Sequence, residues 1–274
     1  MSFIVLVVIG VLVGVTTVLF GFEGGFVTVP IITVADAALG GDAVRVATAT
    51  SALVMLVNAA VATVSARRGA LAPLRGRSPL FVLLGVGGAV GVLAARGAPD
   101  ALLRWGFVAY LGVTVADLLL RPGFLRSSRS ATDRAVATRG GGRDHGPTRT
   151  GVPTATGLPI GAVAAFLGVG GSVVTVPMLR RSGATMTAAT TLANPLTLAI
   201  TLPAAAVTML LPAVVPHAAG LVGAVDVRAA VALLVGAMPV IVLLRRRPPH
   251  LPEVAHAWGY VALLVAAGIV VALG

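Results

Sequence analysis

A single carboxylate lies between glycines in the apolar run GFEGGFVTVP, residues 21–30. A near-copy without the carboxylate, LGVGGSVVTVP, occupies residues 167–177. Glycine lets the backbone approach other groups closely and adopt positive φ. A helix that begins after such a break presents free N–H groups and the positive end of its dipole, which attract anions. The two runs therefore predict a pair of anion-binding half-helices, with one carboxyl group, that of Glu23, beside them.

The two breaks are related copies. Shifting the sequence by 147 residues aligns Phe20–Pro30 with Leu167–Pro177, and six of the eleven aligned positions are identical. We predict that both copies contribute to one substrate site, or else that their glycines only allow helices to pack closely. Close packing is our interpretation of a separate run, GVGGAVG at residues 85–91. The substrate-binding residues predicted in the breaks are Gly21, Gly24, Gly25, Pro30, Gly168, Gly170, Gly171, Ser172 and Pro177.

Polar side chains follow each break at helical spacing. After the second break they recur every three or four residues, which places them on one helix face; they are Thr187, Thr190, Asn194, Thr197 and Thr201. A sparser stripe after the first break consists of Thr48, Ser51 and Asn58. The pair Thr50-Ser51 also matches Thr190-Thr191. We predict that Thr50, Ser51, Thr190, Thr191 and Asn194 flank the substrate; hydrogen bonds to neighbouring helices are the alternative role.

Glu23 is the predicted proton-coupling residue. An ionised carboxylate at the centre of a membrane helix costs about 2.5 kcal/mol or more, so such a residue is a functional candidate. A low dielectric favours the neutral carboxyl group, which could donate a hydrogen bond to an anion so that proton and anion bind together. The alternative is that Glu23 sits at the cytoplasmic interface, served by water and by Arg67 or Arg68.

Composition identifies the elements that must position these residues. Of the 274 residues 57% are hydrophobic and 11% charged, and the mean hydropathy is +1.02. These values predict an all-α polytopic membrane protein, because the apolar runs are continuous rather than alternating. Segments long enough to cross a bilayer are predicted at 3–20, 44–66, 78–95, 101–120, 151–168, 184–212, 228–244 and 256–273.

The distribution of arginine predicts the organisation and orientation of these segments. Residues 121–150 form a basic linker between a first transmembrane repeat, 1–120, and a second, 151–274. Placing the linker in the cytoplasm puts most other arginines there too and the N-terminus outside, although Arg96 and Arg104 then lie outside as well. Each half then has an odd number of full crossings, which makes the halves inverted repeats. We expect about eight to ten membrane segments, including a Gly/Pro-broken re-entrant or half-helix segment in each half.

Several classes of function are not supported. The chain has no cysteine, no metal-ligand spacing and no serine nucleophile in a Gly-x-Ser-Gly setting, so we predict no catalytic residue, no metal and no cofactor. The net charge of +11 lies in loops between apolar runs, so nucleic acid is not an expected partner. The expected partners are a small anionic substrate and the lipid bilayer, with monomer and homodimer both open. A passive anion channel and an intramembrane enzyme are the rival functions.

The two breaks resemble the duplicated motif of the TauE/SafE sulfite exporter family, also called TSUP, which includes proteins like the 4-toluene sulfonate uptake permeases. That motif is a glycine-rich break, four residues and a proline, followed later by a helix rich in Ala, Thr and Ser. Gly168–Ser172 with Pro177 fits it well, and Gly21–Gly25 with Pro30 fits except at Glu23. The resemblance implies a multi-pass transporter of sulfite, thiosulfate, sulfonates or related small anions in a bacterial plasma membrane.

Overall fold

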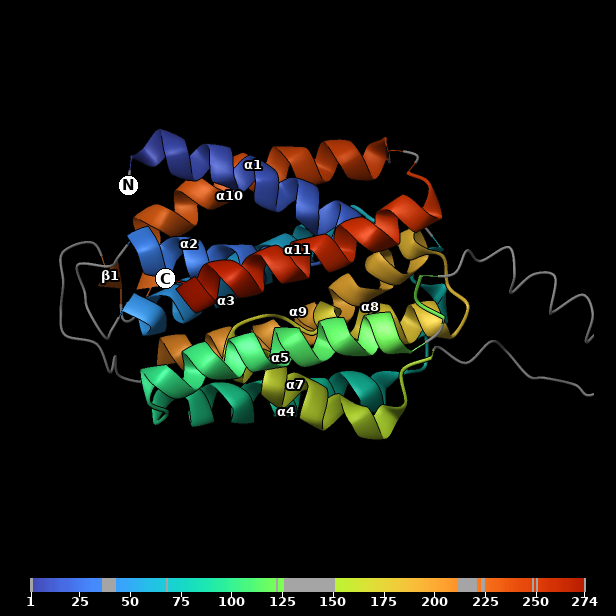
Figure 1. Cartoon of the computed structure of the whole chain (residues 1–274), viewed down its shortest axis with the longest axis horizontal. Coiled ribbons are helices and arrows are strands. Elements are labelled where there is room, and N and C mark those ends of the chain that lie inside the picture. The colour runs from blue at the N-terminus through green and yellow to red at the C-terminus, as the bar shows by residue number, and fades with distance from the viewer. Residues whose placement is uncertain are drawn as a thin grey trace, which may run out of the picture.

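A computed structural model describes residues 2–35, 43–67, 69–121, 123–125, 151–210, 221–222, 225–247, 249 and 251–273. These residues form a bundle of roughly parallel and antiparallel helices (Figure 1). Most of the linker predicted at 121–150, and Arg68, lie outside the described residues. The elements are α1 (Phe3–Phe20), α2 (Gly25–Ala35), α3 (Ala43–Val64), η2 (Ala72–Leu74), α4 (Ser78–Arg96), α5 (Asp100–Leu120), η3 (Thr154–Thr156), α7 (Gly157–Leu167), α8 (Ser172–Arg181), α9 (Met186–Leu210), β1 (Leu221–Val222), β2 (Val225–Asp226), α10 (Val227–Arg246) and α11 (Glu253–Leu273).

Seven helices of the described chain are long and apolar enough to cross a membrane: α1, α3, α4, α5, α9, α10 and α11. Large apolar side chains on several of them are exposed, among them Ile4, Val113 and Leu120. Such a surface is unfavourable in water and suits lipid contact. The prediction of an all-α polytopic membrane protein is confirmed.

The fifth of the eight predicted spans, 151–168, is wrong as a full crossing helix. Its apolar helical part runs only from Thr154 to Leu167, and α7 itself has 11 residues. At 1.5 Å per residue α7 is about 16 Å long, roughly half the hydrocarbon thickness. Hydropathy cannot reveal this, because the residues are as apolar as those of a full span.

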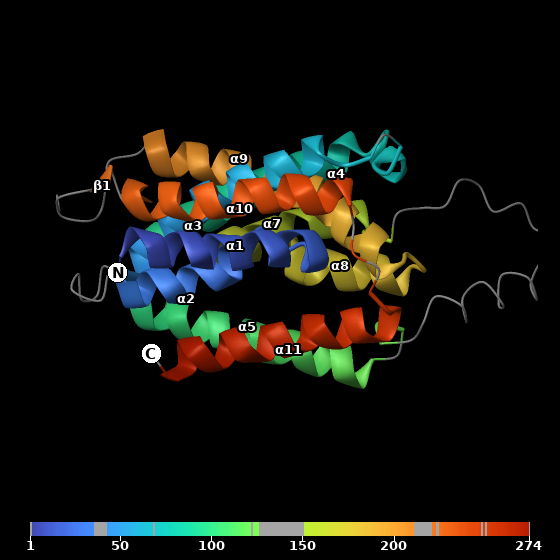
Figure 2. The same cartoon turned by 90° about the horizontal axis from the view of Figure 1, so that it is seen from above.

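The short helices α2, α7 and α8 belong to two hairpins, α1–α2 and α7–α8, that turn inside the bundle (Figure 1). The N-terminus and the end of α2 lie at one end of the bundle, whereas α7 begins and α8 finishes at the other (Figures 1 and 2). Each turn starts at a glycine in the left-handed conformation, Gly21 at φ 72° and Gly168 at φ 67°. The Gly21 N–H donates to the Thr17 carbonyl, and the Gly168 N–H donates to the Ala164 carbonyl. This C-cap ends a helix without a steric penalty only if the residue lacks a Cβ.

The halves are joined by two closely packed helix pairs, α1 with α10 and α4 with α7. A Cβ on Gly236 of α10 would lie 2.1 Å from the Val7 carbonyl oxygen of α1. In the other pair, a Cβ on Gly91 of α4 would lie 2.1 Å from the Ala162 carbonyl oxygen of α7. Glycine therefore lets the backbones touch, and the packing role predicted for residues 85–91 is confirmed.

We expect Gly236→Val to destabilise the fold by about 1–3 kcal/mol, because the added side chain overlaps a backbone atom that only a helix displacement can move. Gly112→Val is the matched control, since a Cβ on Gly112 of α5 would meet nothing within 4 Å. Thermal unfolding of both variants in the same detergent measures the difference. Equal melting temperatures would contradict the close packing of α1 and α10.

Candidate functional site

The two breaks lie against each other, although 147 residues separate them in the sequence. A Cβ on Gly25 would lie 2.9 Å from the Gly168 carbonyl oxygen. Ser51 Oγ on α3 bridges them by donating to the Gly25 and Gly168 carbonyl oxygens, at 3.2 and 3.4 Å. The start of α2 and the end of α7 are therefore brought together, so the two breaks meet at one place.

Each break also contacts the long helix of the opposite half. A Cβ on Gly21 would lie 3.2 Å from the Thr190 carbonyl oxygen of α9, and one on Gly168 would lie 2.9 Å from Thr48 Cγ2 of α3. Thr48 and Thr190 therefore correspond to each other, because each contacts the break of the opposite half; Thr50 does not have this contact. The Thr50 hydroxyl instead accepts a hydrogen bond from the Asp226 N–H at 2.9 Å, at the start of α10. The sequence alone matched Thr50 with Thr190, because the chain between each break and the following long helix differs in length between the two halves.

Glu23 lies inside the first break and is 0% exposed, so it is not at an aqueous interface. Its φ of 42° is positive, which is uncommon for a residue with a side chain. Its backbone carbonyl accepts from Asn58 Nδ2 at 3.0 Å. Within the described chain neither carboxyl oxygen has a hydrogen-bond partner, although the Ser172 and Thr197 side chains are its polar neighbours.

The second break completes the surroundings of this carboxyl group. A Cβ on Gly170 would lie 3.5 Å from Glu23 Oε2 and 3.2 Å from Thr197 Cγ2. The copy of the motif that lacks an acid therefore lies directly against the acid of the other copy. Tyr260 of α11 packs against the second break. Its hydroxyl lies 3.2 Å from both the Ser172 and Val173 carbonyl oxygens.

The polar stripe of α9 faces this centre. Thr190, Asn194, Thr197 and Thr201 are buried, whereas Thr187 is exposed. Asn194 Nδ2 donates to the Thr190 carbonyl at 3.0 Å. In the described residues the side-chain oxygens buried here without a partner include, besides those of Glu23, Asn58 Oδ1, Ser172 Oγ, Asn194 Oδ1 and Thr197 Oγ1. Buried polar atoms are normally satisfied, so such a cluster suits a site that takes up water or a polar ligand.

The remaining predicted residues occupy structural positions around the breaks. Gly24 has φ 94°, and a Cβ there would meet Val13 Cγ1 at 2.4 Å. Gly171 is the N-cap of α8 and accepts from the Val174 and Thr175 amides. Both prolines lie within helices rather than at their ends: α2 continues past Pro30 to Ala35, and α8 continues past Pro177 to Arg181.

A pocket reaches the second break between α3, α4, α7 and α9, and we call it the Arg96 pocket. It contacts both glycines of the second break that have positive φ, Gly168 and Gly170. Its other principal residues are Thr48, Met55, Arg96 and Thr201. Arg96 is in the last turn of α4, at the end of the bundle where the N-terminus lies (Figure 1).

A second pocket, the Arg245 pocket, lies among the end of α1, the start of α9 and the end of α10. Its principal residues are Arg67, Thr187, Thr191, Arg245 and His256. Arg245 is in the last turn of α10, which finishes at the opposite end of the bundle from the N-terminus (Figures 1 and 2). The polar centre is therefore flanked by one pocket toward each end.

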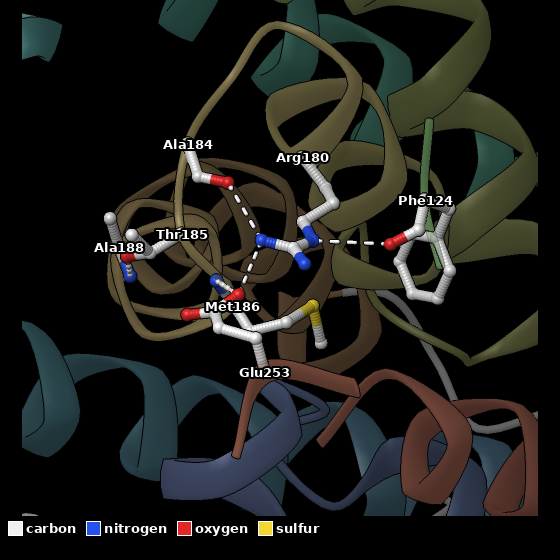
Figure 3. Close-up of polar contacts among 7 residues, drawn as sticks. All are labelled: Phe124, Arg180, Ala184, Thr185, Met186, Ala188 and Glu253. Carbon is white, nitrogen blue, oxygen red and sulfur yellow. Dashed lines mark hydrogen bonds and ion pairs between the residues drawn. The ribbon is translucent and has the colours of Figure 1, made fainter. Parts of the chain in front are cut away.

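Arg180 is one of the arginines that the sequence predicts only to lie on the cytoplasmic side, yet its side chain is 1% exposed. Figure 3 shows its guanidinium group between three acceptors. It pairs with Glu253 of α11 and donates to the Phe124 and Ala184 carbonyl oxygens at 3.2 and 3.3 Å. Glu253 Oε2 also accepts from the Met186 N–H at 3.2 Å, at the start of α9. Arg180 therefore fixes the end of the second hairpin to α11.

The burial of Arg245 was also not predicted. Its position does carry a signal, because the buried face of α10 runs through Leu233, Ala237, Ile241 and Arg245 at spacings of four. In the run Arg245–Arg247 only the first arginine continues that face, and Arg246 is exposed. Helical periodicity of the preceding apolar residues could have singled it out.

Comparison with known proteins identifies the family of this chain. The family profile described as sulfite exporter TauE/SafE matches residues 6–271. Comparison with curated proteins and with solved structures found no match. The match covers almost the whole chain, including both breaks, both pockets and the seven long apolar helices apart from the first residues of α1 and the last of α11. The chain therefore belongs to the sulfite exporter TauE/SafE family of multi-pass membrane transporters.

Proposed function

We propose that this protein is a secondary transporter of a small sulfur-containing or organic anion, of the sulfite, thiosulfate and sulfonate class. The carrying observation is the contact between the two breaks, with a pocket on either side. The helices α2 and α8 start directly after the irregular backbone of the breaks, and helix starts bind anions. Alternating access would expose this centre first to the Arg96 pocket and then to the Arg245 pocket. The partners are the anion and the lipid of a bacterial plasma membrane, without nucleic acid, cofactor or enzymatic reaction.

Glu23 is the proton-coupling residue in this proposal. An ionised carboxylate buried without a partner is costly, so the site favours its neutral form, and the neutral form can donate to an anion. Its ionised form would repel the same anion. Proton and anion then bind together and leave together, which is the requirement for coupling.

We infer that the two halves are inverted repeats. In support, α1 packs on α10 and α7 packs on α4, so the first helix of each half lies against the fourth helix of the other. The contacts of Gly21 with Thr190 and of Gly168 with Thr48 also join equivalent positions of one half to the other. In Figures 1 and 2, α1 and α7 start from opposite ends of the bundle.

The orientation follows from the helix ends. Arg180, Arg181, Arg245 and Arg246 lie in the last turns of α8 and α10, so positive charge gathers at the end of the bundle opposite the N-terminus, which we assign to the cytoplasm. We expect cysteines introduced at Ser2 and Ser128 of this cysteine-free chain to react with an impermeant thiol reagent from opposite sides of the membrane. Labelling from the same side would contradict the inverted arrangement.

Transport by the purified protein in liposomes tests the function. We expect uptake of labelled sulfite, thiosulfate or a sulfonate that increases when a pH gradient is imposed. Uptake that equilibrates the anion but ignores the gradient would indicate a passive channel. No flux of any of the three anions would overturn the proposed substrate class.

Gly171→Val tests the role of the breaks within that assay. A Cβ on Gly171 would meet Ile200 Cδ1 at 2.5 Å and Thr197 Oγ1 at 3.8 Å. Because the closest atom is the tip of a movable side chain, we expect the variant to fold but to lose transport at least tenfold. Gly112→Val serves again as the control. If Gly171→Val only reduces the amount of folded protein, the glycines serve packing alone.

A further inference from the structure

Arg245 is a buried cation whose hydrogen-bonding capacity is largely unused. Its exposed fraction is 8%, and Nη1 donates to Thr191 Oγ1 at 2.8 Å. Within the described chain Nε and Nη2 have no hydrogen-bond partner, and no ion pair joins Arg245 to a described carboxylate. Unsatisfied donors on a buried charge are costly, so a partner is expected at this position.

The ordinary explanation for an arginine at the end of a membrane helix does not fit. Such a side chain usually extends to the interface, where water satisfies its N–H groups. Arg246 and Arg247, the next two residues, are exposed as this explanation requires. Arg245 instead turns inward to Thr191, and it lines the Arg245 pocket.

The pocket has the charge and the groups that an oxyanion needs. Arg67 adds a second positive charge at its wall, and no acidic residue is among the described residues that line it. The free Nε–H and Nη2–H lie in the plane of the guanidinium, which favours two-pronged binding of carboxylate-like or sulfur oxyanions. The Thr191 hydroxyl holds that plane by accepting from Nη1.

The same position adjoins the centre of the molecule. Thr191 follows Thr190, whose backbone contacts Gly21 of the first break. Glu23 of that break is near enough to Arg245 for the carboxylate, when ionised, to interact with it electrostatically without forming an ion pair. An anion at Arg245 would therefore lie between the pocket and the two breaks.

We propose that Arg245, held by Thr191, is a binding site for a small sulfur oxyanion on the side of the bundle where α10 ends. This proposal rests on the proposed function and adds to it a ligand-binding side chain outside the glycine breaks. The site receives the anion from the Arg245 pocket, or releases it there, while the breaks bind it at the centre.

Binding of sulfite to the full-length protein in detergent tests the site without depending on transport. We expect sulfite to raise the melting temperature of the wild type above that in chloride at equal ionic strength, because a ligand stabilises the state that binds it. Arg245→Gln should weaken sulfite binding at least tenfold, whereas Arg246→Gln, which removes the same charge one residue away, should change it less than twofold. Arg245→Gln with wild-type affinity would overturn the proposal.

Two further variants keep the test decisive if Arg245→Gln does not fold. Arg245→Lys retains the charge but not the planar fork, and Thr191→Val removes the hydroxyl that orients it; each should weaken sulfite binding several-fold. Wild-type affinity in both would overturn the site.

If sulfite binds through Arg245 but none of the sulfur anions is transported, the proposed function fails and the binding site stands. If transport occurs and is unchanged in Arg245→Gln, the binding site fails and the proposed function stands.

Discussion

Glu23→Gln is expected to abolish accumulation of the anion driven by a pH gradient, while anion binding and exchange of anion across the membrane continue. Glutamine has nearly the same shape as the protonated carboxyl group and donates a hydrogen bond, so the anion-binding form is retained permanently. What it cannot do is release a proton. Since Glu23 is fully buried without a described partner for its carboxyl oxygens, the substitution removes no ion pair, and the fold should not lose stability.

Two measurements separate this outcome from a general defect. Counterflow of labelled anion should proceed at a rate near that of the wild type, whereas net uptake with an imposed gradient should fall to the level without one. Asp100→Asn, which removes an acid from the first turn of α5, should leave both unchanged. If Glu23→Gln still accumulates anion in response to the gradient, another group carries the proton.

Arg180→Gln is expected to produce the largest loss of stability, about 3 kcal/mol, because breaking a buried ion pair leaves charges and acceptors without partners. The substitution removes the pair with Glu253 and the donors to the Phe124 and Ala184 carbonyl oxygens (Figure 3). The guanidinium is almost completely buried, so water cannot replace these interactions.

The neighbouring residue provides the matched control. Arg181 also pairs with an acid, Asp117, at 2.7 Å, but the two side chains are 25% and 29% exposed. Ion pairs near water contribute little, so Arg181→Gln should cost about 1 kcal/mol or less. Melting temperatures of the two variants in detergent, with Glu253→Gln to complete a double-mutant cycle, measure the difference. A loss for Arg180→Gln as small as that for Arg181→Gln would show that the pair is not structurally important.

The helices were predictable because each is specified locally. Continuous apolar runs predicted seven of the eight proposed spans, and the repeated Gly21 and Gly168 predicted where two helices stop. The stripe from Thr190 to Thr201 predicted a buried polar face, and it is buried. The prediction that residues 151–168 cross the membrane failed because hydropathy indicates burial or lipid contact. It does not indicate whether a helix crosses completely.

The site was predictable only in part, because its contacts join residues far apart in the chain. No local pattern says that Ser51 bridges Gly25 and Gly168, or that Thr48 rather than Thr50 faces the second break. An arginine at a helix end has the same sequence whether it extends to water or turns inward. Arg180 therefore needed the tertiary arrangement before its burial could be recognised, whereas Arg245 continues the apolar face of α10 at a spacing of four residues.

The glycine contacts between α1 and α10, and between α4 and α7, decide which parts of the molecule can move as rigid bodies. Sequence divides the chain at its basic linker, but each of these pairs takes one helix from either side of that division. Sliding one half past the other would separate backbones that meet at Gly236 and at Gly91. Each rigid unit therefore combines helices from both sides of the linker: α1 moves with α10, and α4 moves with α7. The linker could be cut without releasing either half.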